Sequence, residues 1–165
     1  LLCRIQKIKQ KKVKNFIGKN YKLPIYDSNK TAIKKTELDE WVKNGYINYI
    51  GETDFVREEL EKTNCVVLPS YREGLSKVLI EASSMSLPII TTNVPGCKDV
   101  VIDGETGFLC KVKDSFDLAI QMEKMILLPK EELILMGQNG RKRAVEVFDE
   151  KIIINHYKDI IYRFK

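Results

Sequence analysis

Short apolar runs alternate with amphipathic stretches along the chain, and this alternation predicts an α/β fold. The runs at 65–68 and 88–92 are short and continuous, like the strands that parallel sheets bury on both faces. A third, β-rich run covers 46–50. We expect these three runs to form parallel strands. Weaker strand signals lie at 1–3, 23–26 and 108–110.

Apolar residues at helical spacing predict the helices that connect and follow these strands. The expected helices lie at 9–17, 31–42, 54–62, 76–85, 115–128, 130–147 and 150–163, with Asp54 as the N-cap of the third. Strands and helices that alternate with short connections favour a doubly wound, Rossmann-like parallel sheet, here with a helical C-terminal tail.

Positive charge is concentrated at the beginning of the chain. Residues 1–35 carry a formal charge of +10, whereas the other 130 residues carry −5. A basic segment attracts phosphate, nucleic acid or an anionic membrane surface, and a solvated lysine-rich helix face explains the same residues equally well. Nucleic acid is the weakest of these partners because no aromatic residues are interleaved with the lysines and no recognised motif accompanies them. We therefore expect no nucleic-acid partner.

The length of 165 residues is enough for one domain with its own core. No run of 18 apolar residues occurs, so a membrane-spanning helix is not expected. The chain opens without an initiator Met, from which we expect a fragment, or a chain whose upstream part is encoded elsewhere.

The cysteines argue against a metal site. The chain has four, none of them in a Cys-x-x-Cys pair, and the single histidine, His156, is far from all of them in the sequence. We expect no metal ion. Cys65 and Cys110 stand in apolar surroundings and are predicted to be small buried hydrophobes, which fits a reducing cytoplasm.

The strongest functional signal follows the run at 65–68. Ligands in open α/β sheets bind outside the carboxyl ends of strands, and Gly74 there permits close approach of the backbone. Free amides at the helix start, near Leu75 and Ser76, suit an anionic diphosphate. Glu73 and Glu81 are eight residues apart, about 12 Å along a helix, which approaches the separation of two sugars across a diphosphate. The alternative is a pair of ordinary surface glutamates.

This segment resembles a known signature. The stretch from Glu73 to Glu81 is similar to the E-x7-E motif of retaining GT-B glycosyltransferases, specifically glycosyltransferase family 4. The resemblance extends from about Ser28 to Asp114. Further similar segments are 65–70, 81–82, 87–90, 93–101 and 103–109.

The resemblance implies a role for each matching residue. Glu73 would be the catalytic-site carboxylate that contacts the transferred sugar, and Glu81 would hold the ribose hydroxyls. The amides of Gly74, Leu75 and Ser76 would meet the diphosphate and the sugar.

Three further donor contacts are implied nearer the start of the chain. Gly51 would border the base. The family also clamps the diphosphate with an Arg and a Lys five residues apart, a spacing that Arg4 and Lys9 offer. Cys3 stands where the family usually has glycine, and 10–27 is shorter than the family's helix and second strand.

The resemblance also implies an activity and a domain plan. The expected reaction transfers a hexosyl or N-acetylhexosaminyl group from a nucleotide-diphosphate sugar, with UDP-sugar favoured, to a glycan or lipid-linked acceptor, without any cofactor. Residues 1–148 would form the donor-binding, C-terminal half of a GT-B fold, and 149–165 a helix that crosses to a missing N-terminal domain. The isolated chain is expected to be inactive.

The expected location is the cytoplasm, with peripheral contact at the inner face of a membrane left open. Two other functions stay open. One is a GT-B sugar-nucleotide epimerase, and the other is a non-catalytic remnant or a nucleotide-sugar-binding domain without turnover.

Overall fold

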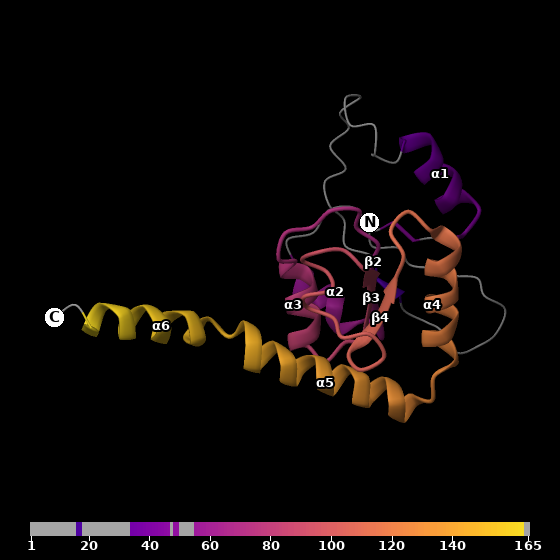
Figure 1. Cartoon of the computed structure of the whole chain (residues 1–165). Helices are drawn as coiled ribbons and strands as arrows, with labels where there is room; N and C mark the ends of the chain where they lie inside the picture. The colour runs from indigo at the N-terminus through magenta and orange to yellow at the C-terminus, as the bar shows by residue number, and fades with distance from the viewer. Residues whose placement is uncertain (1–15, 18–33, 47, 50–54, 164–165) are drawn as a thin grey trace.

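The computed structural model describes residues 16–17, 34–46, 48–49 and 55–163, and its centre is a four-stranded parallel sheet (Figure 1). The strands lie side by side in the order in which they follow one another along the chain. They are β1 (Phe16–Ile17), β2 (Cys65–Leu68), β3 (Ile89–Thr92) and β4 (Gly107–Cys110). Because every pair is parallel, the carboxyl ends of all strands lie at one edge, called here the carboxyl edge.

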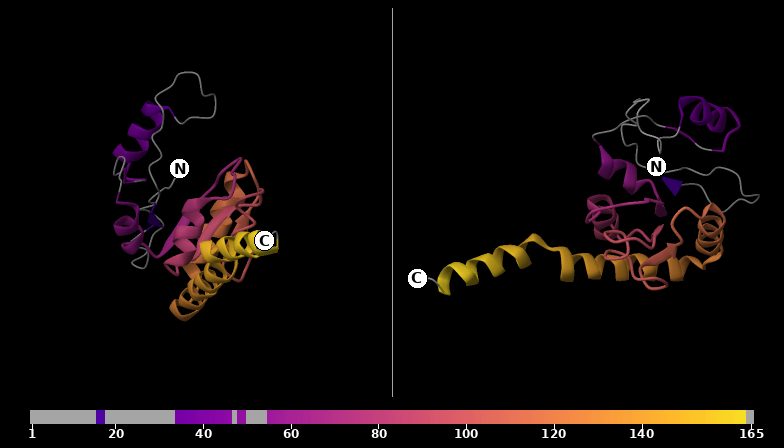
Figure 2. Two further views of the ribbon diagram at one scale, coloured as in Figure 1. Left: turned by 90° about the vertical axis from the view of Figure 1, so that its left-hand side faces the viewer. Right: turned by 45° about the horizontal axis from the view of Figure 1, so that its top comes forward.

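Helices cover both faces of this sheet (Figure 2). Those before and around the sheet are α1 (Lys35–Lys43), α2 (Val56–Glu61) and α3 (Lys77–Ser84). Those after it are α4 (Ser115–Leu127), α5 (Lys130–Phe148) and α6 (Glu150–Arg163). The expected doubly wound α/β fold is therefore confirmed.

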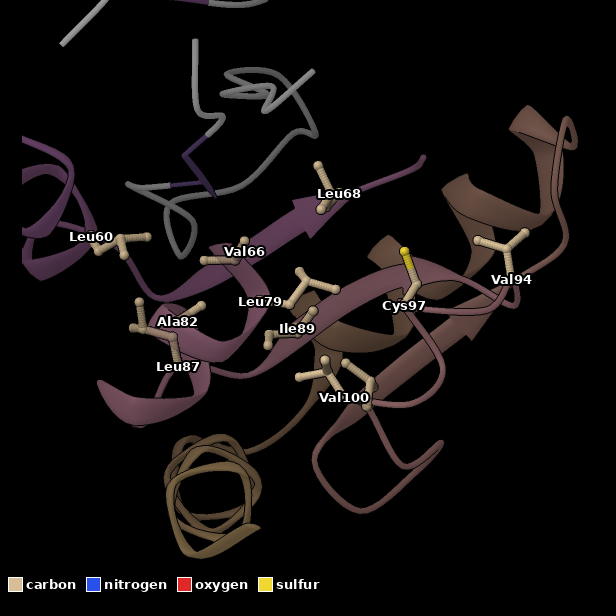
Figure 3. Packing of buried hydrophobic residues seen from close by; sticks show 11 residues of the cluster. Leu60, Val66, Leu68, Leu79, Ala82, Leu87, Ile89, Val94, Cys97 and Val100 are labelled. Atoms are coloured by element: carbon tan, nitrogen blue, oxygen red, sulfur yellow. The ribbon is translucent and has the colours of Figure 1, made fainter. Parts of the chain in front are cut away.

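The alternation of side chains along β2 explains why all four of its residues are buried. Val66 and Leu68 point to one face, where they pack with Leu79 of α3 and Ile89 of β3 (Figure 3). Val67 points to the other face. It packs there with the β3 residue Ile90 and with residues Met122 and Met125 of α4. A strand covered on both faces must be apolar throughout, as the run at 65–68 is.

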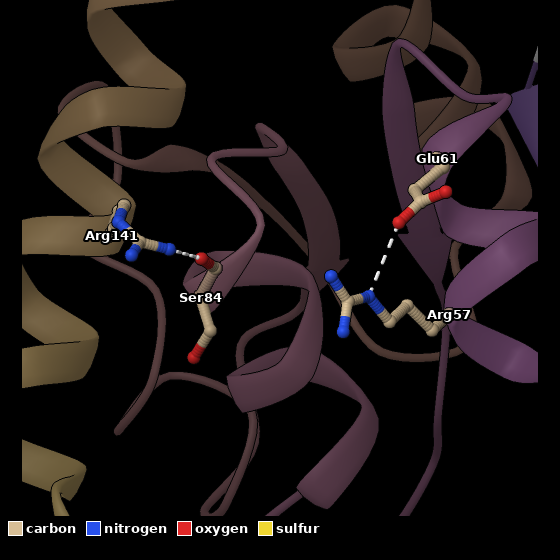
Figure 4. A network of polar contacts seen from close by, with 4 residues as sticks. All are labelled: Arg57, Glu61, Ser84 and Arg141. Atoms are coloured by element: carbon tan, nitrogen blue, oxygen red, sulfur yellow. Dashed lines mark hydrogen bonds and ion pairs between the residues drawn. The ribbon is translucent and has the colours of Figure 1, made fainter.

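Helix α5 packs closely against α3. A Cβ atom on Gly140 would lie 3.9 Å from the Cα atom of Ser83, so the two helices approach closely. Arg141 donates a hydrogen bond to the carbonyl oxygen of Ser84 at the end of α3 (Figure 4). The other contact in that view, between Arg57 and Glu61 at 3.2 Å, is an exposed pair within α2.

Helix α6 projects away from the body of the domain (Figure 1). None of its residues is buried. Its large exposed apolar side chains are Ile152, Ile153, Ile154, Tyr157, Ile160, Ile161 and Tyr162. The apolar residues at 152–154, 157, 160, 161 and 164 predict a helix with a broad apolar face that packs poorly within its own domain. This prediction is confirmed for the described residues, and Phe164 lies outside them.

Two expectations near the start of the chain are wrong. Phe16 and Ile17, expected at the end of a basic helix over 9–17, form β1 and pair with Cys65 and Val66. The run at 46–50 is not a strand at any of its described residues, which are 46, 48 and 49. The expected strands at 1–3 and 23–26 and the cap at Asp54 lie outside the described residues.

The end of α1 explains the second error. Gly45 has a φ of +68°, and the amide of Tyr46 donates to the carbonyl of Trp41 at 2.9 Å. This bond, together with that from Gly45 to Val42, closes the helix in a Schellman motif. The backbone of Tyr46 therefore serves as a helix cap and is not available to a strand.

Within the described parts of the chain, no helix has the length and apolar character needed to span a membrane.

Candidate functional site

Three loops meet at the carboxyl edge of the sheet, following β2 (69–76), β3 (93–97) and β4 (111–114). Side-chain hydroxyls join the first two. The Thr91 hydroxyl donates to the carbonyl of Leu68 at 2.7 Å, and the Thr92 hydroxyl donates to the carbonyl of Ser70. The loop that carries Glu73 is thereby anchored to β3 at its first residues.

Gly96 supports the same loop from the β3 side. Its φ of +81° lies in the left-handed region, and a Cβ atom there would overlap the carbonyl group of Gly74. The amide of Ser76 donates to the carbonyl of Gly96 at 3.5 Å. Only glycine allows the two loops to approach this closely.

The turn from Glu73 to Ser76 opens α3. Ser76 is the N-cap residue, yet it is only 1 % exposed and its hydroxyl makes no hydrogen bond among the described residues. Its amide is directed at Gly96, whereas the amides of Gly74 and Leu75 have no hydrogen-bond partner in the part of the chain that the structure describes. Of the three predicted amides, Gly74 and Leu75 are thus the two that an anion can still reach.

Glu73 is half-buried, and its backbone carbonyl lies close to Gly96 in the loop after β3. Burial is the main reason that the pKa of the Cys97 thiol is raised, and the negative charge of Glu73 raises it further. Hydrogen bonds with Thr91 and Thr92 act in the opposite direction. Glu73 therefore stands where its loop meets the loop after β3.

Glu81 lies on the second turn of α3. Its side chain is 37 % exposed and forms an ion pair with Lys77, with 3.9 Å between Nζ and Oε1. The structure thus carries both glutamates on one loop-and-helix unit that starts at the carboxyl edge. That they face a single cleft stays a prediction.

One pair at this edge was missed by the sequence reasoning. Lys113, in the loop after β4, holds its ammonium group 5.7 Å from the ring centroid of Tyr71, two residues before Glu73. Both side chains are exposed. No local pattern could have revealed this contact, because it joins two loops that only the folded sheet brings together.

The expected contacts at Arg4, Lys9 and Gly51 lie outside the described residues. Among the described residues, no three His, Cys, Asp or Glu side chains gather closely enough to hold a metal ion. At the carboxyl edge, the described residues therefore provide the free amides of Gly74 and Leu75 for an anion. They also provide the carboxylates of Glu73 and Glu81, which can accept hydrogen bonds from hydroxyl groups.

Comparison with known proteins identifies relatives of this chain. The glycosyltransferase CapM of capsular polysaccharide biosynthesis in Staphylococcus aureus is 42% identical over 92 residues, which cover 54% of this chain and 23% of CapM. The N-acetyl-alpha-D-glucosaminyl L-malate synthase of Bacillus anthracis is 36% identical over 126 residues, covering 73% of this chain and 32% of the synthase. The chain thus spans about a third or less of the length of these relatives.

Solved structures share the fold. HepE from Anabaena, in complex with UDP and glucose, superposes with a TM-score of 0.69 at 19% identity over 78% of this chain and 36% of HepE. At this identity the likeness concerns the fold alone. Residues 5–143 match the family described as glycosyl transferases group 1. The chain belongs to the glycosyl transferases group 1 family.

Proposed function

We propose that this chain supplies the donor-binding half of a retaining glycosyltransferase of family 4. The observation that carries the proposal is the turn from Glu73 to Ser76, which stands at the carboxyl edge with the amides of Gly74 and Leu75 free. These amides would stabilise the negative charge that develops on the leaving diphosphate, and this stabilisation is the main task of this half in the transfer.

The carboxylates would select the donor. Glu81 would accept hydrogen bonds from the ribose hydroxyls, and Glu73 would do the same for the transferred sugar. UDP is the favoured nucleotide, and the UDP bound by the similarly folded HepE supports this choice. Arg4 and Lys9 would clamp the diphosphate, and Gly51 would border the base. No metal ion or other cofactor is required by this arrangement.

The acceptor would be a glycan or a lipid-linked sugar, and the transferred group a hexosyl or N-acetylhexosaminyl unit. The name of CapM, a glycosyltransferase of capsular polysaccharide biosynthesis, supports a glycan acceptor, and the name of the N-acetyl-alpha-D-glucosaminyl L-malate synthase supports an N-acetylhexosaminyl group. The reaction would take place in the cytoplasm.

The domain plan rests on the break between α5 and α6. Asp149 has an extended backbone, with φ −65° and ψ 127°, and it separates the packed α5 from the wholly exposed α6. Residues 1–148 would therefore form the donor domain. Residues 149–165 would cross to an N-terminal GT-B domain, which would cover the apolar side chains of α6 and complete the site.

A calorimetric titration with UDP, ADP, GDP and the corresponding diphospho-sugars tests this proposal. We expect the chain to bind UDP and its sugars more tightly than the purine nucleotides, and to show no transfer to any acceptor by itself. A chain that binds none of these ligands would favour the non-catalytic remnant. Interconversion of two UDP-sugars would favour the epimerase.

A further inference from the structure

We infer that the contact between Tyr71 and Lys113 is a positioning device, which holds the Glu73 loop in the conformation that recognises the transferred sugar. The inference rests on the proposed function. The contact joins the loop after β2 to the loop after β4, on either side of the central strand β3.

Among the described residues, the other contacts that hold the loop at 69–76 come from the β3 side. Its first part is anchored through the hydroxyl of Thr92, and its last part through the approach of Gly96 to Gly74. The side chain of Tyr71 reaches further in the same direction, past β3 to the loop that follows β4. Lys113 thus supplies a second support, next to the residue that would bind the sugar.

The geometry of Lys113 indicates that its position is fixed by the fold. Its φ is 59°, a left-handed conformation that a side chain other than that of glycine rarely adopts. Hydrogen bonds also hold the backbone just before and just after Lys113. The amide of Lys111 donates to the carboxylate of Asp117 at 2.7 Å, and the amide of Asp117 donates to the carboxylate of Asp114 at 2.9 Å. These two bonds hold the loop without any contribution from the contact between Lys113 and the ring.

The charge of Lys113 is available for the ring. Lys113 forms no ion pair within the described part of the chain, and its ammonium lies at a distance where attraction to the face of an aromatic ring is effective. Tyr71 is 53 % exposed, so the contact lies at the surface. Its loss should therefore change the affinity for a ligand by a small factor and should leave the protein folded.

The positioning role predicts a specific pattern of binding losses. Glu73 would contact the sugar but not the nucleotide, so loosening its loop should weaken UDP-glucose and UDP-N-acetylglucosamine more than UDP. We expect Tyr71→Leu and Lys113→Met each to reduce the affinity for the UDP-sugar, relative to UDP, about two- to fivefold. Because both changes remove one contact, the double variant should lose no more than either single variant.

Two conservative variants serve as matched controls. Tyr71→Phe keeps the aromatic face, and Lys113→Arg keeps a cation that attracts it, so both should bind like the parent. Lys113→Met retains the length of the side chain and the requirement for a left-handed backbone, so any loss in this variant reports the charge. Denaturation midpoints close to that of the parent would show that all variants are folded.

Titration calorimetry of these variants with UDP, UDP-glucose and UDP-N-acetylglucosamine decides the matter. Losses confined to the UDP-sugars, non-additive in the double variant and absent from the conservative variants, support the inference. Equal losses for UDP and UDP-sugar would overturn it, because the contact would then not act through the sugar-binding residue Glu73. Additive or absent losses would also overturn it. A parent chain that binds neither UDP nor a UDP-sugar contradicts the proposed function itself, and this inference with it.

Discussion

Gly96 packs so closely against the loop that carries Glu73 that a Cβ atom there would lie 2.7 Å from the Glu73 carbonyl oxygen. We therefore predict that Gly96→Ala is strongly destabilising. The left-handed backbone alone should cost about 1–2 kcal/mol, and the overlap with the loop a further 1–3 kcal/mol or so. Urea denaturation measures the sum.

Gly104→Ala is the matched control for this prediction. Gly104 has a similar φ of +77°, but an added Cβ atom would meet nothing within 4 Å. It should show the backbone cost without the overlap. If the two variants were equally stable, the close approach between Gly96 and the Glu73 loop would not be present in solution.

The exposed face of α6 should cause the chain to self-associate, because its apolar side chains have no cover within the domain. A double substitution of Ile153→Glu and Ile161→Glu is expected to shift sedimentation towards the monomer. Lys158→Glu, a charge change on the same helix, should leave association nearly unchanged. Since no residue of α6 is buried, a chain ending at Asp149 should keep the denaturation midpoint of the parent when both are measured at a concentration where the parent is a monomer. A clear fall in that midpoint would contradict the exposed position of the helix.

Because its thiols are buried, we expect the protein to have a smaller free energy of unfolding at high pH. Burial, helped by the Asp117 carboxylate, raises the pKa of Cys110 to about 11 from an ordinary 9.0. The thiol ionises first in the unfolded chain, so its contribution is complete below pH 9.0 and is lost as the pH rises towards the folded-state value. Unfolding free energies measured from pH 8 to 11 should therefore fall less steeply for Cys110→Ala than for the parent. Parallel curves would contradict this.

The same burial should make these thiols slow to react. At pH 8, in a Cys3→Ser background, an alkylating reagent should modify Cys65, Cys97 and Cys110 only after denaturant is added, because all three are buried. Rapid modification of Cys97 or Cys110 in the native protein would show that the carboxyl edge opens readily.

The parts of the fold that were predicted from sequence are those with a local cause. The runs at 65–68 and 88–92 are apolar because both faces of the sheet are covered, and the helices after residue 115 begin at clear breaks such as Pro129. β1 could not be predicted in this way, since a two-residue strand at Phe16–Ile17 exists only through its pairing with the distant β2.

The same distinction between local signals and contacts made by folding applies to the candidate site. The segment from Glu73 to Glu81 could be found because the glycine, the helix start and both carboxylates are neighbours in the sequence. The support by Gly96 and the contact between Tyr71 and Lys113 join separate loops. Their partners become neighbours only when β2, β3 and β4 align their carboxyl ends.

The central claim is that Glu81 holds the ribose of a bound nucleotide. Lys142 and Glu146 on α5 form an ion pair at the same 3.9 Å and the same four-residue spacing as Lys77 and Glu81, but α5 does not start at the carboxyl edge. Glu146→Ala is therefore a control that removes an equivalent helical pair away from the site.

The decisive measurement is the affinity of Glu81→Ala for UDP by titration calorimetry, beside the parent, Glu146→Ala and Glu73→Ala. Loss of a charge-assisted hydrogen-bond acceptor should weaken UDP binding by about 1.5–3 kcal/mol, or roughly ten- to a hundredfold, in Glu81→Ala. Glu146→Ala and Glu73→Ala should bind UDP like the parent, and Glu73→Ala should lose affinity only for the UDP-sugar. If the parent binds UDP and Glu81→Ala binds it equally well, the ribose role of Glu81 is wrong.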